Sequence, residues 1–180
     1  MAHPGSPTIP ERRSQGYPMR IVEFGDFQCP FCQNFHFAVE ELMDELTDQV
    51  SLVYYDYPLD GHPFAVAAAL AARCARADGR FEEMATELFA KQDSIGLRSW
   101  LSYARSAGIS DTAGFRSCMQ DSVSQAGVDA DHALGTELGV MGTPTVIING
   151  WRFNMPPSVD SLKHYAREIV DGRSPFVARR

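Results

Sequence analysis

Apolar residues in the first third of the chain predict a strand, a helix and a second strand. Largely apolar runs predict strands over residues 19–25 and 50–57, the second rich in β-branched and aromatic residues and ended by Pro58. Between them, apolar side chains at helical spacing predict a helix over residues 33–46. A strand–helix–strand unit of this kind implies a crossover between parallel strands.

The middle of the chain, residues 63–138, shows helical patterns only. Its helix ends carry recognisable residues, because Ser99 suits the start of a helix and Gly108 suits the end of one. The predicted helices cover residues 64–77, 81–92, 99–107, 111–120 and 124–138.

Strand patterns then return. Residues 145–148 lead into Asn149-Gly150, a strong hairpin signal, and residues 151–153 form the return strand. Ser158 is suited to cap a last amphipathic helix, which Gly172 ends.

The order of these elements predicts an α/β protein with a thioredoxin-type fold, β-α-β then β-β-α, interrupted by an all-helical insertion. On this prediction the thioredoxin-like domain is discontinuous and comprises residues 19–62 and 139–172, with the insertion at 63–138. Residues 1–18 form a flexible leader, and residues 173–180 form a loose tail.

Composition narrows the functions that this fold could serve. The 180 residues are 44% hydrophobic and suit one domain, or one domain with an insertion. A net charge of −7 argues against binding to nucleic acid.

No apolar run approaches the length of a membrane span, and the leader, rich in Pro, Gly and Ser, has no secretory signal pattern. Because a signal can be lost by trimming, its absence does not settle the compartment.

The candidate chemistry lies in Cys29-Pro30-Phe31-Cys32, between the first strand and the first helix. Two cysteines at this spacing are typical of a dithiol/disulfide redox centre. The unpaired N–H groups and dipole of a helix N-terminus favour negative charge, so we expect a lowered pKa for Cys29. Pro30 suits the first helical turn, where its missing N–H has no partner to lose.

Two other uses of the cysteine pair remain. His36 completes a C-x2-C-x3-H pattern, but structural zinc requires four ligands, and Cys74 and Cys118 stand far away in sequence. The pair could also be an inert structural disulfide. The redox interpretation is favoured, with neither metal nor cofactor.

Three separated segments together resemble the DsbA-like thiol–disulfide oxidoreductases of the thioredoxin superfamily, over about residues 20–172. They are Val22 to Cys32, then Tyr57-Pro58-Leu59 with His62-Pro63 and the helix ending Ala72-Arg73-Cys74-Ala75, and finally Val140 to Thr145.

The resemblance implies roles for residues outside the cysteine motif. Pro144 would be a cis-proline facing the active site, turning the Thr143 backbone towards a client peptide; the alternative is a trans proline that starts a strand. Glu23 would be a partly buried acid that exchanges protons with Cys32; the alternative is a strand-edge glutamate facing water. We interpret Asp26 as a turn residue rather than a second acid.

Phe31 departs from the best-known members, which carry His between the cysteines. A phenyl ring offers the thiolate neither a hydrogen bond nor a positive charge. We therefore expect a less stabilised Cys29 thiolate and a less oxidising centre than with His at position 31.

Cys74 and Cys118 lie on apolar helix faces, and cysteines at similar places pair in some relatives. A structural disulfide there would close a long loop and favour an oxidising compartment. The alternative is two buried free thiols.

The remaining residues of interest have structural interpretations. We expect His62 to start a helix and His36 to lie on the surface. Several apolar side chains are expected around the site, where exposed ones would bind unfolded peptide: Phe24, Phe27, Phe31, Met141 and Trp151.

The sequence therefore predicts a protein disulfide oxidoreductase acting as a dithiol oxidase on cysteines of client proteins. The alternatives are a reductase or disulfide isomerase of the same fold, and a non-catalytic metal-binding or chaperone-like module. We expect a periplasmic or otherwise extracytoplasmic location, with a membrane quinone-linked oxidase as the resetting partner. The cytoplasm is the alternative location.

Overall fold

The computed structural model describes residues 16–153 and 155–176. Most of the predicted leader (residues 1–15) and the end of the predicted tail (residues 177–180) lie outside the described residues. The elements in chain order are β1 (Met19–Gly25), α1 (Pro30–Glu45), β2 (Val50–Asp56), α2 (Ala65–Ala77), α3 (Phe81–Ala90), η2 (Gln92–Ser94), α4 (Trp100–Ser106), α5 (Thr112–Cys118), α6 (Ser122–Glu137), β3 (Thr145–Ile148), β4 (Trp151–Phe153) and α7 (Val159–Val170).

The four strands form one sheet in the order β2-β1-β3-β4. β1 and β2 are parallel, whereas β3 is antiparallel to both β1 and β4. Asn149 and Gly150 both have positive φ angles, as the tight turn between β3 and β4 requires. The predicted α/β fold, with β-α-β and β-β-α parts separated by helices, is confirmed.

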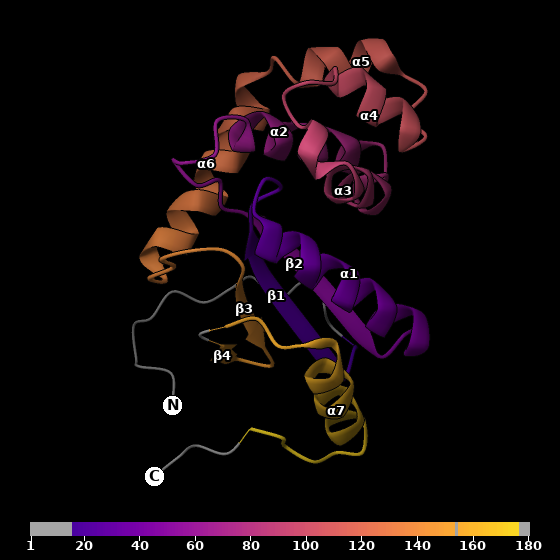
Figure 1. Cartoon of the computed structure of the whole chain (residues 1–180), viewed down its shortest axis with the longest axis vertical. Coiled ribbons are helices and arrows are strands. Elements are labelled where there is room, and N and C mark those ends of the chain that lie inside the picture. The colour runs from indigo at the N-terminus through magenta and orange to yellow at the C-terminus, as the bar shows by residue number, and fades with distance from the viewer. Residues whose placement is uncertain (1–15, 154, 177–180) are drawn as a thin grey trace.

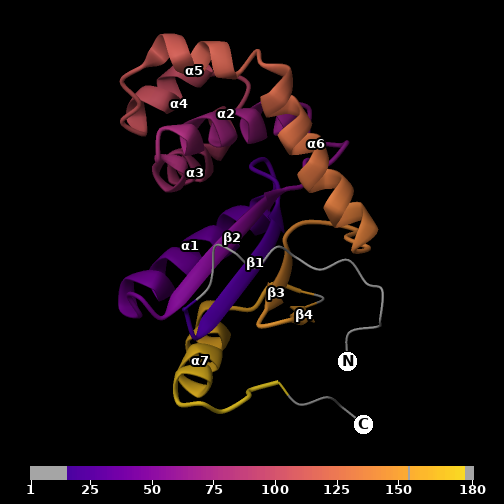
Figure 2. The same ribbon diagram turned by 180° about the vertical axis from the view of Figure 1, so that it is seen from behind.

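Helices cover both faces of the sheet. Alternate residues of a strand point to opposite faces, so Met19 and Ile21 of β1 pack with α1 and α7, while Phe24 packs with α6. Figure 1 shows α2 to α5 grouped at one end of the molecule, with α6 running from that group towards β3. Figure 2 shows the same arrangement from behind.

The helical group has its own apolar core, and this core reaches the cysteine motif. Buried side chains of α2, α3, α4 and α5 form one cluster that also contains Phe27, Cys29, Cys32 and Tyr54. The sheet and the helical group therefore meet at the start of α1. In the part of the chain that the structure describes, no helix is both long and apolar enough to cross a membrane.

The expectation that Pro30 lies in the first turn of a helix, with Cys29 at its N-terminus, is confirmed, because α1 begins at Pro30 and Cys29 serves as the N-cap with extended backbone angles. One expectation, for the tail, requires correction. The first residues of the predicted loose tail are packed, since the Phe176 ring contacts the rings of Trp151, Phe153 and Tyr165.

Candidate active site

Cys29 and Cys32 lie at the first turn of α1, and both are free thiols. Cys29 is 4% exposed and Cys32 is fully buried, whereas Phe31 between them is 60% exposed. The motif therefore places an aromatic ring in solvent, with Cys29 at the edge of the interior and Cys32 beneath it.

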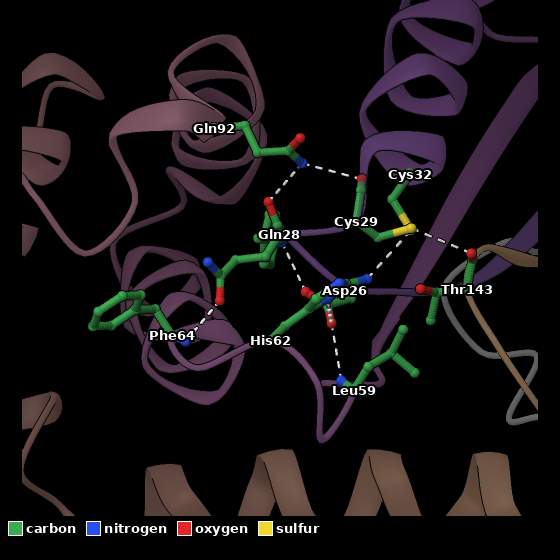
Figure 3. A network of polar contacts seen from close by, with 10 residues as sticks. Asp26, Gln28, Cys29, Cys32, Leu59, His62, Phe64, Gln92 and Thr143 are labelled. Atoms are coloured by element: carbon green, nitrogen blue, oxygen red, sulfur yellow. Dashed lines mark hydrogen bonds and ion pairs between the residues drawn. The ribbon is translucent and has the colours of Figure 1, made fainter.

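The loop before β3 lies against Cys29. The Cys29 thiol donates a hydrogen bond to the Thr143 carbonyl (3.3 Å), and the Thr143–Pro144 peptide bond is cis. On the inner side, the backbone N–H of Asp26 donates to Cys32 Sγ (3.4 Å). Figure 3 shows both contacts. The sheet explains this arrangement, because Thr145 pairs with Phe24 and so carries the loop to the cysteine end of β1.

The two thiols differ in acidity. A hydrogen bond from the Cys32 thiol is the main cause that lowers the pKa of Cys29 to about 5; burial opposes it, and the Thr143 side chain and the N–H groups of Phe31 and Cys32 add to it. Burial raises the pKa of Cys32 well above its ordinary value, and its hydrogen bond to Cys29 adds to the rise. Of the two thiols, Cys29 is therefore the one that more readily forms a thiolate.

Glu23 lies on β1, in the interior of the protein. It is fully buried, and its neighbours across the sheet are Tyr54 and Val146. Neither carboxyl oxygen has a hydrogen-bond partner that meets normal geometry among the described residues. Burial, and secondarily the charge on Cys29, raise the pKa of Glu23 to about 8, although the Cys32 thiol opposes the rise. The alternative of a glutamate facing water is wrong.

Asp26 is more than the turn residue that the sequence predicts. Its carboxylate is fully buried and accepts hydrogen bonds from the N–H groups of Gln28 (2.7 Å) and Leu59 (2.9 Å). It also pairs with Nδ1 of His62 at 2.7 Å. Since the Asp26 backbone binds Cys32, one residue joins the cysteine motif to the segment that leads into α2 (Figure 3).

His62 does not start α2, which begins at Ala65 with Phe64 as its N-cap. Its ring instead turns back to Asp26, with 27% of the side chain exposed to solvent. The sequence gives no local signal for this pair, because the two residues are 36 positions apart.

Two glutamine side chains form hydrogen bonds between the helical group and the region of the cysteine motif. Nε2 of Gln92, which follows α3, donates to the carbonyls of Phe27 (2.8 Å) and Cys29 (3.0 Å). In return, Nε2 of Gln33 on α1 donates to the Phe89 carbonyl (2.6 Å). Sequence reasoning missed both glutamines, because no motif marks a side-chain amide that caps a distant carbonyl.

The expectation that His36 lies on the surface is wrong. The side chain is buried, its Nε2 lies 3.2 Å from Thr86 Oγ1 and 3.3 Å from a Glu40 oxygen, and burial lowers its pKa. Within residues 16–153 and 155–176, no three His, Cys, Asp or Glu side chains are grouped closely enough to hold a metal ion.

Cys74 on α2 and Cys118 on α5 form a disulfide, with their Cα atoms 5.8 Å apart. The alternative of two free thiols is therefore wrong. This bond ties two helices of the insertion together.

A groove of about 460 Å³ opens beside the cysteine motif. Its lining is mostly apolar and includes the cis-proline loop: Phe31, Met141, Gly142, Thr143, Pro144, Thr145, Arg152, Phe153, Met155 and Pro156. Met141 is 94% exposed. Of the other aromatic residues expected here, Phe27 is buried in the core that contains the cysteines. Phe24 packs beneath α6, and Trp151 packs on Phe176 instead.

Known proteins are similar to this chain in sequence and in fold. A family model described as "Thioredoxin" matches residues 16–167. The chain is 35% identical over 152 residues to "Na(+)/H(+) antiporter NhaA 1" of Mycolicibacterium gilvum, an alignment covering 81% of this chain and 24% of the antiporter. It is 27% identical over 157 residues to "Probable disulfide bond formation protein D" of Bacillus anthracis, covering 81% of this chain and 71% of that protein. The chain thus spans about a quarter of the length of the antiporters that it matches.

Solved structures agree in fold. A thioredoxin-like oxidoreductase from Silicibacter pomeroyi is 26% identical with a TM-score of 0.68, and the match covers 87% of each chain. Oxidised BdbD from Bacillus subtilis is 21% identical with a TM-score of 0.73, covering 89% of this chain and 91% of that chain.

Proposed function

The chain belongs to the thioredoxin family, and on that basis we propose that it is a thiol–disulfide oxidoreductase acting on cysteines of client proteins. One observation carries the proposal. Cys29 has a pKa lowered to about 5 and lies against the Thr143 carbonyl, beside an open, mostly apolar groove. This arrangement combines a reactive sulfur with a surface for an unfolded chain.

In the proposed reaction the enzyme starts as the Cys29–Cys32 disulfide. A client thiolate attacks the sulfur of Cys29, a mixed disulfide forms, and Cys32 leaves as a thiolate. Because its pKa is raised, Cys32 takes up a proton, and we assign the buried carboxyl of Glu23 as the group that relays it. A second client thiolate then attacks the client sulfur and releases Cys29. Two electrons pass from the client to the enzyme, and the client gains a disulfide.

The groove residues are proposed to hold the client chain during these steps. Thr143 and Pro144 form the wall nearest Cys29, and Phe31 extends from the motif into the same groove. Pro30 and Phe31 are both exposed and would contact the client directly.

We propose that the physiological direction is oxidation of client dithiols. A stabilised Cys29 thiolate favours the reduced enzyme and so makes its disulfide a better oxidant. The side chain of Phe31 favours the rival reductase or isomerase role, because a phenyl ring gives the thiolate no hydrogen bond. Equilibration of Cys29–Cys32 with glutathione separates the roles, and a potential as reducing as that of thioredoxin would overturn the oxidase direction.

The activity is tested by replacing Cys29 with serine. We expect loss of both insulin reduction and oxidative refolding of a reduced protein. The matched control is the double change Cys74→Ser and Cys118→Ser, which removes the other two sulfurs and should leave activity in place. Retained activity in Cys29→Ser would exclude the mechanism.

An extracytoplasmic location and a membrane-bound resetting partner complete the proposal. The Cys74–Cys118 bond supports this location, because structural disulfides persist in oxidising compartments. Alkylation of free thiols in intact cells tests it. We expect Cys74 and Cys118 to be protected before reduction, and rapid alkylation of both would contradict the assignment.

A further inference from the structure

Arg152 gives the otherwise apolar groove a positive charge. Among the described residues that line the groove, it is the only one with a charged side chain. The chain as a whole has a net charge of −7, so this local charge is opposite to that of the molecule.

The fold holds the guanidinium group in place. Arg152 lies on β4 opposite Ile147 and reaches the end of α6, where Nη1 donates to the Leu138 carbonyl and Nη2 to the Gly139 carbonyl, both at 2.8 Å. These carbonyls belong to the C-terminal end of a helix, which favours positive charge. The side chain therefore has a fixed position at the groove wall.

The anchoring bonds leave part of the guanidinium group available. An arginine side chain carries five N–H donors, and these two bonds use two of them. The ion pairs found among the described residues do not include Arg152, so no carboxylate there neutralises it. A carboxylate that entered the groove would meet an oriented cation with free donors.

We propose that the groove selects client segments that carry an aspartate or glutamate close to the reacting cysteine, with Arg152 as the specificity-determining residue. The inference rests on the proposed function and narrows its substrate class. The Thr143–Pro144 wall that receives the client beside Cys29 lines the same groove as Arg152. A carboxylate a few residues from the client sulfur is thereby within reach of the guanidinium, while apolar neighbours contact Phe31, Met141 and Met155.

Matched peptides test this selectivity in the full chain. Each peptide contains one pair of cysteines and differs at one position near the attacked cysteine, which is Glu, Gln or Lys. The measured quantity is kcat/KM for oxidation by the Cys29–Cys32 disulfide. Because the pairing is partly exposed to solvent, we expect the Glu peptide to exceed the Lys peptide by about five-fold at low salt, and added salt to reduce the ratio.

Variants separate charge recognition from support of the fold. Arg152→Glu should invert the preference in favour of the Lys peptide, Arg152→Gln should abolish it, and Arg152→Lys should retain it. Comparing variants on the same peptides also cancels intrinsic differences in peptide thiol reactivity. The control is Arg105→Glu, which makes the same charge change on α4, outside the lining of the groove.

The outcomes distinguish this inference from the proposed function. If the wild-type protein oxidises Glu and Lys peptides equally, or if the preference survives in Arg152→Gln, the inference is overturned and the oxidoreductase proposal stands. If no peptide is oxidised in a Cys29-dependent way, both are overturned. The comparison of the wild-type protein with Arg152→Gln and Arg152→Lys decides the question even if Arg152→Glu does not fold.

Discussion

The two cysteine side chains of the motif have the same chemistry in isolation, but the fold lowers the pKa of Cys29 and raises the pKa of Cys32. The sequence predicts a lowered pKa for Cys29 from its place at the start of α1. In the structure, the largest cause is the hydrogen bond from Cys32, while the backbone N–H groups of the helix contribute less. The acidity of Cys29 is therefore a property of the pair.

Replacing Cys32 with alanine tests this origin. The donor to Cys29 is removed, so we expect the pKa of Cys29 to rise from about 5 by more than about one unit. The thiolate absorbance at 240 nm, followed against pH, measures the midpoint. Cys32→Ser is the control, since its hydroxyl keeps a donor at the same place and should preserve part of the shift. An unchanged midpoint in the alanine variant would assign the effect to the helix.

The buried Glu23 predicts a pH dependence of stability. Its pKa is raised from 4.5 to about 8, so the folded state disfavours the charged form. The free energy of unfolding should then fall as pH rises from about 4.5 to 8, because only the unfolded chain ionises freely in this range. Glu23→Gln should remove a penalty of about 4 kcal/mol near pH 8 and change little near pH 4.

Urea unfolding of the two proteins at both pH values measures this difference. The effect should be smaller in the oxidised protein, because the charge of Cys29 is one cause of the raised pKa. Equal stability of the two proteins at both pH values would show that Glu23 ionises normally in the fold.

At the scale of single residues, the sequence predicts those features of the site that depend on a local pattern of residues. The cysteine pair follows from its spacing, whereas the role of Thr143 and Pro144 comes from the resemblance to the DsbA-like family. The burial of Asp26 and its pairing with His62 depend on a contact between distant segments, which no local pattern records. Arg152 likewise has no motif, because its position depends on where α6 ends.

At the scale of elements, strand bounds are predicted better than helix bounds. β1, β3 and β4 begin and end where the apolar runs and turn residues place them. Helix ends shift because tertiary contacts compete with periodicity. The helix predicted over 81–92 ends at Ala90. Gln92 begins a short 3-10 segment, and its side chain reaches the residues just before α1.

The Gln92 contact predicts that α3 and α1 stabilise each other. Gln92→Ala would leave the carbonyls of Phe27 and Cys29 without this donor, so we expect a loss of about 2 kcal/mol in the free energy of unfolding. Chemical unfolding measures the loss. Gln125→Ala is the control, because its amide donates to the exposed Asp129, and the change should alter stability by less than about 0.5 kcal/mol. Equal losses would mean that the amide of Gln92 does not join these helices.

At the scale of the whole molecule, a second junction, remote from the cysteines, holds the helical group on the sheet. The end of β2 supplies the buried Asp56, and α2 supplies Arg73, whose Nη2 lies 3.3 Å from Asp56 and 2.6 Å from Asp131 on α6. Gly127 makes room for this guanidinium, because a Cβ there would lie 2.5 Å from Nη1. One cation therefore joins β2, α2 and α6.

The substitution Arg73→Met measures the strength of this junction and the pH dependence of that strength. The change leaves two carboxylates without their shared partner, so we expect a loss of about 3 kcal/mol near pH 8. Burial, more than the nearby Asp131, raises the pKa of Asp56 to about 7, and Arg73 opposes the rise. Below that pKa Asp56 is neutral and needs no cation, so the loss should shrink near pH 5.

The control is Arg80→Met, which breaks an exposed pair with Glu83 and should cost less than about 1 kcal/mol at either pH. Thermal unfolding of the three proteins across this pH range separates the possibilities. A loss that is the same at pH 5 and pH 8 would mean that Arg73 acts through packing or through its pair with Asp131, and not through an ionised Asp56. A loss confined to high pH would show that the charge of Arg73 compensates an ionised Asp56 and so holds the helical group to the sheet.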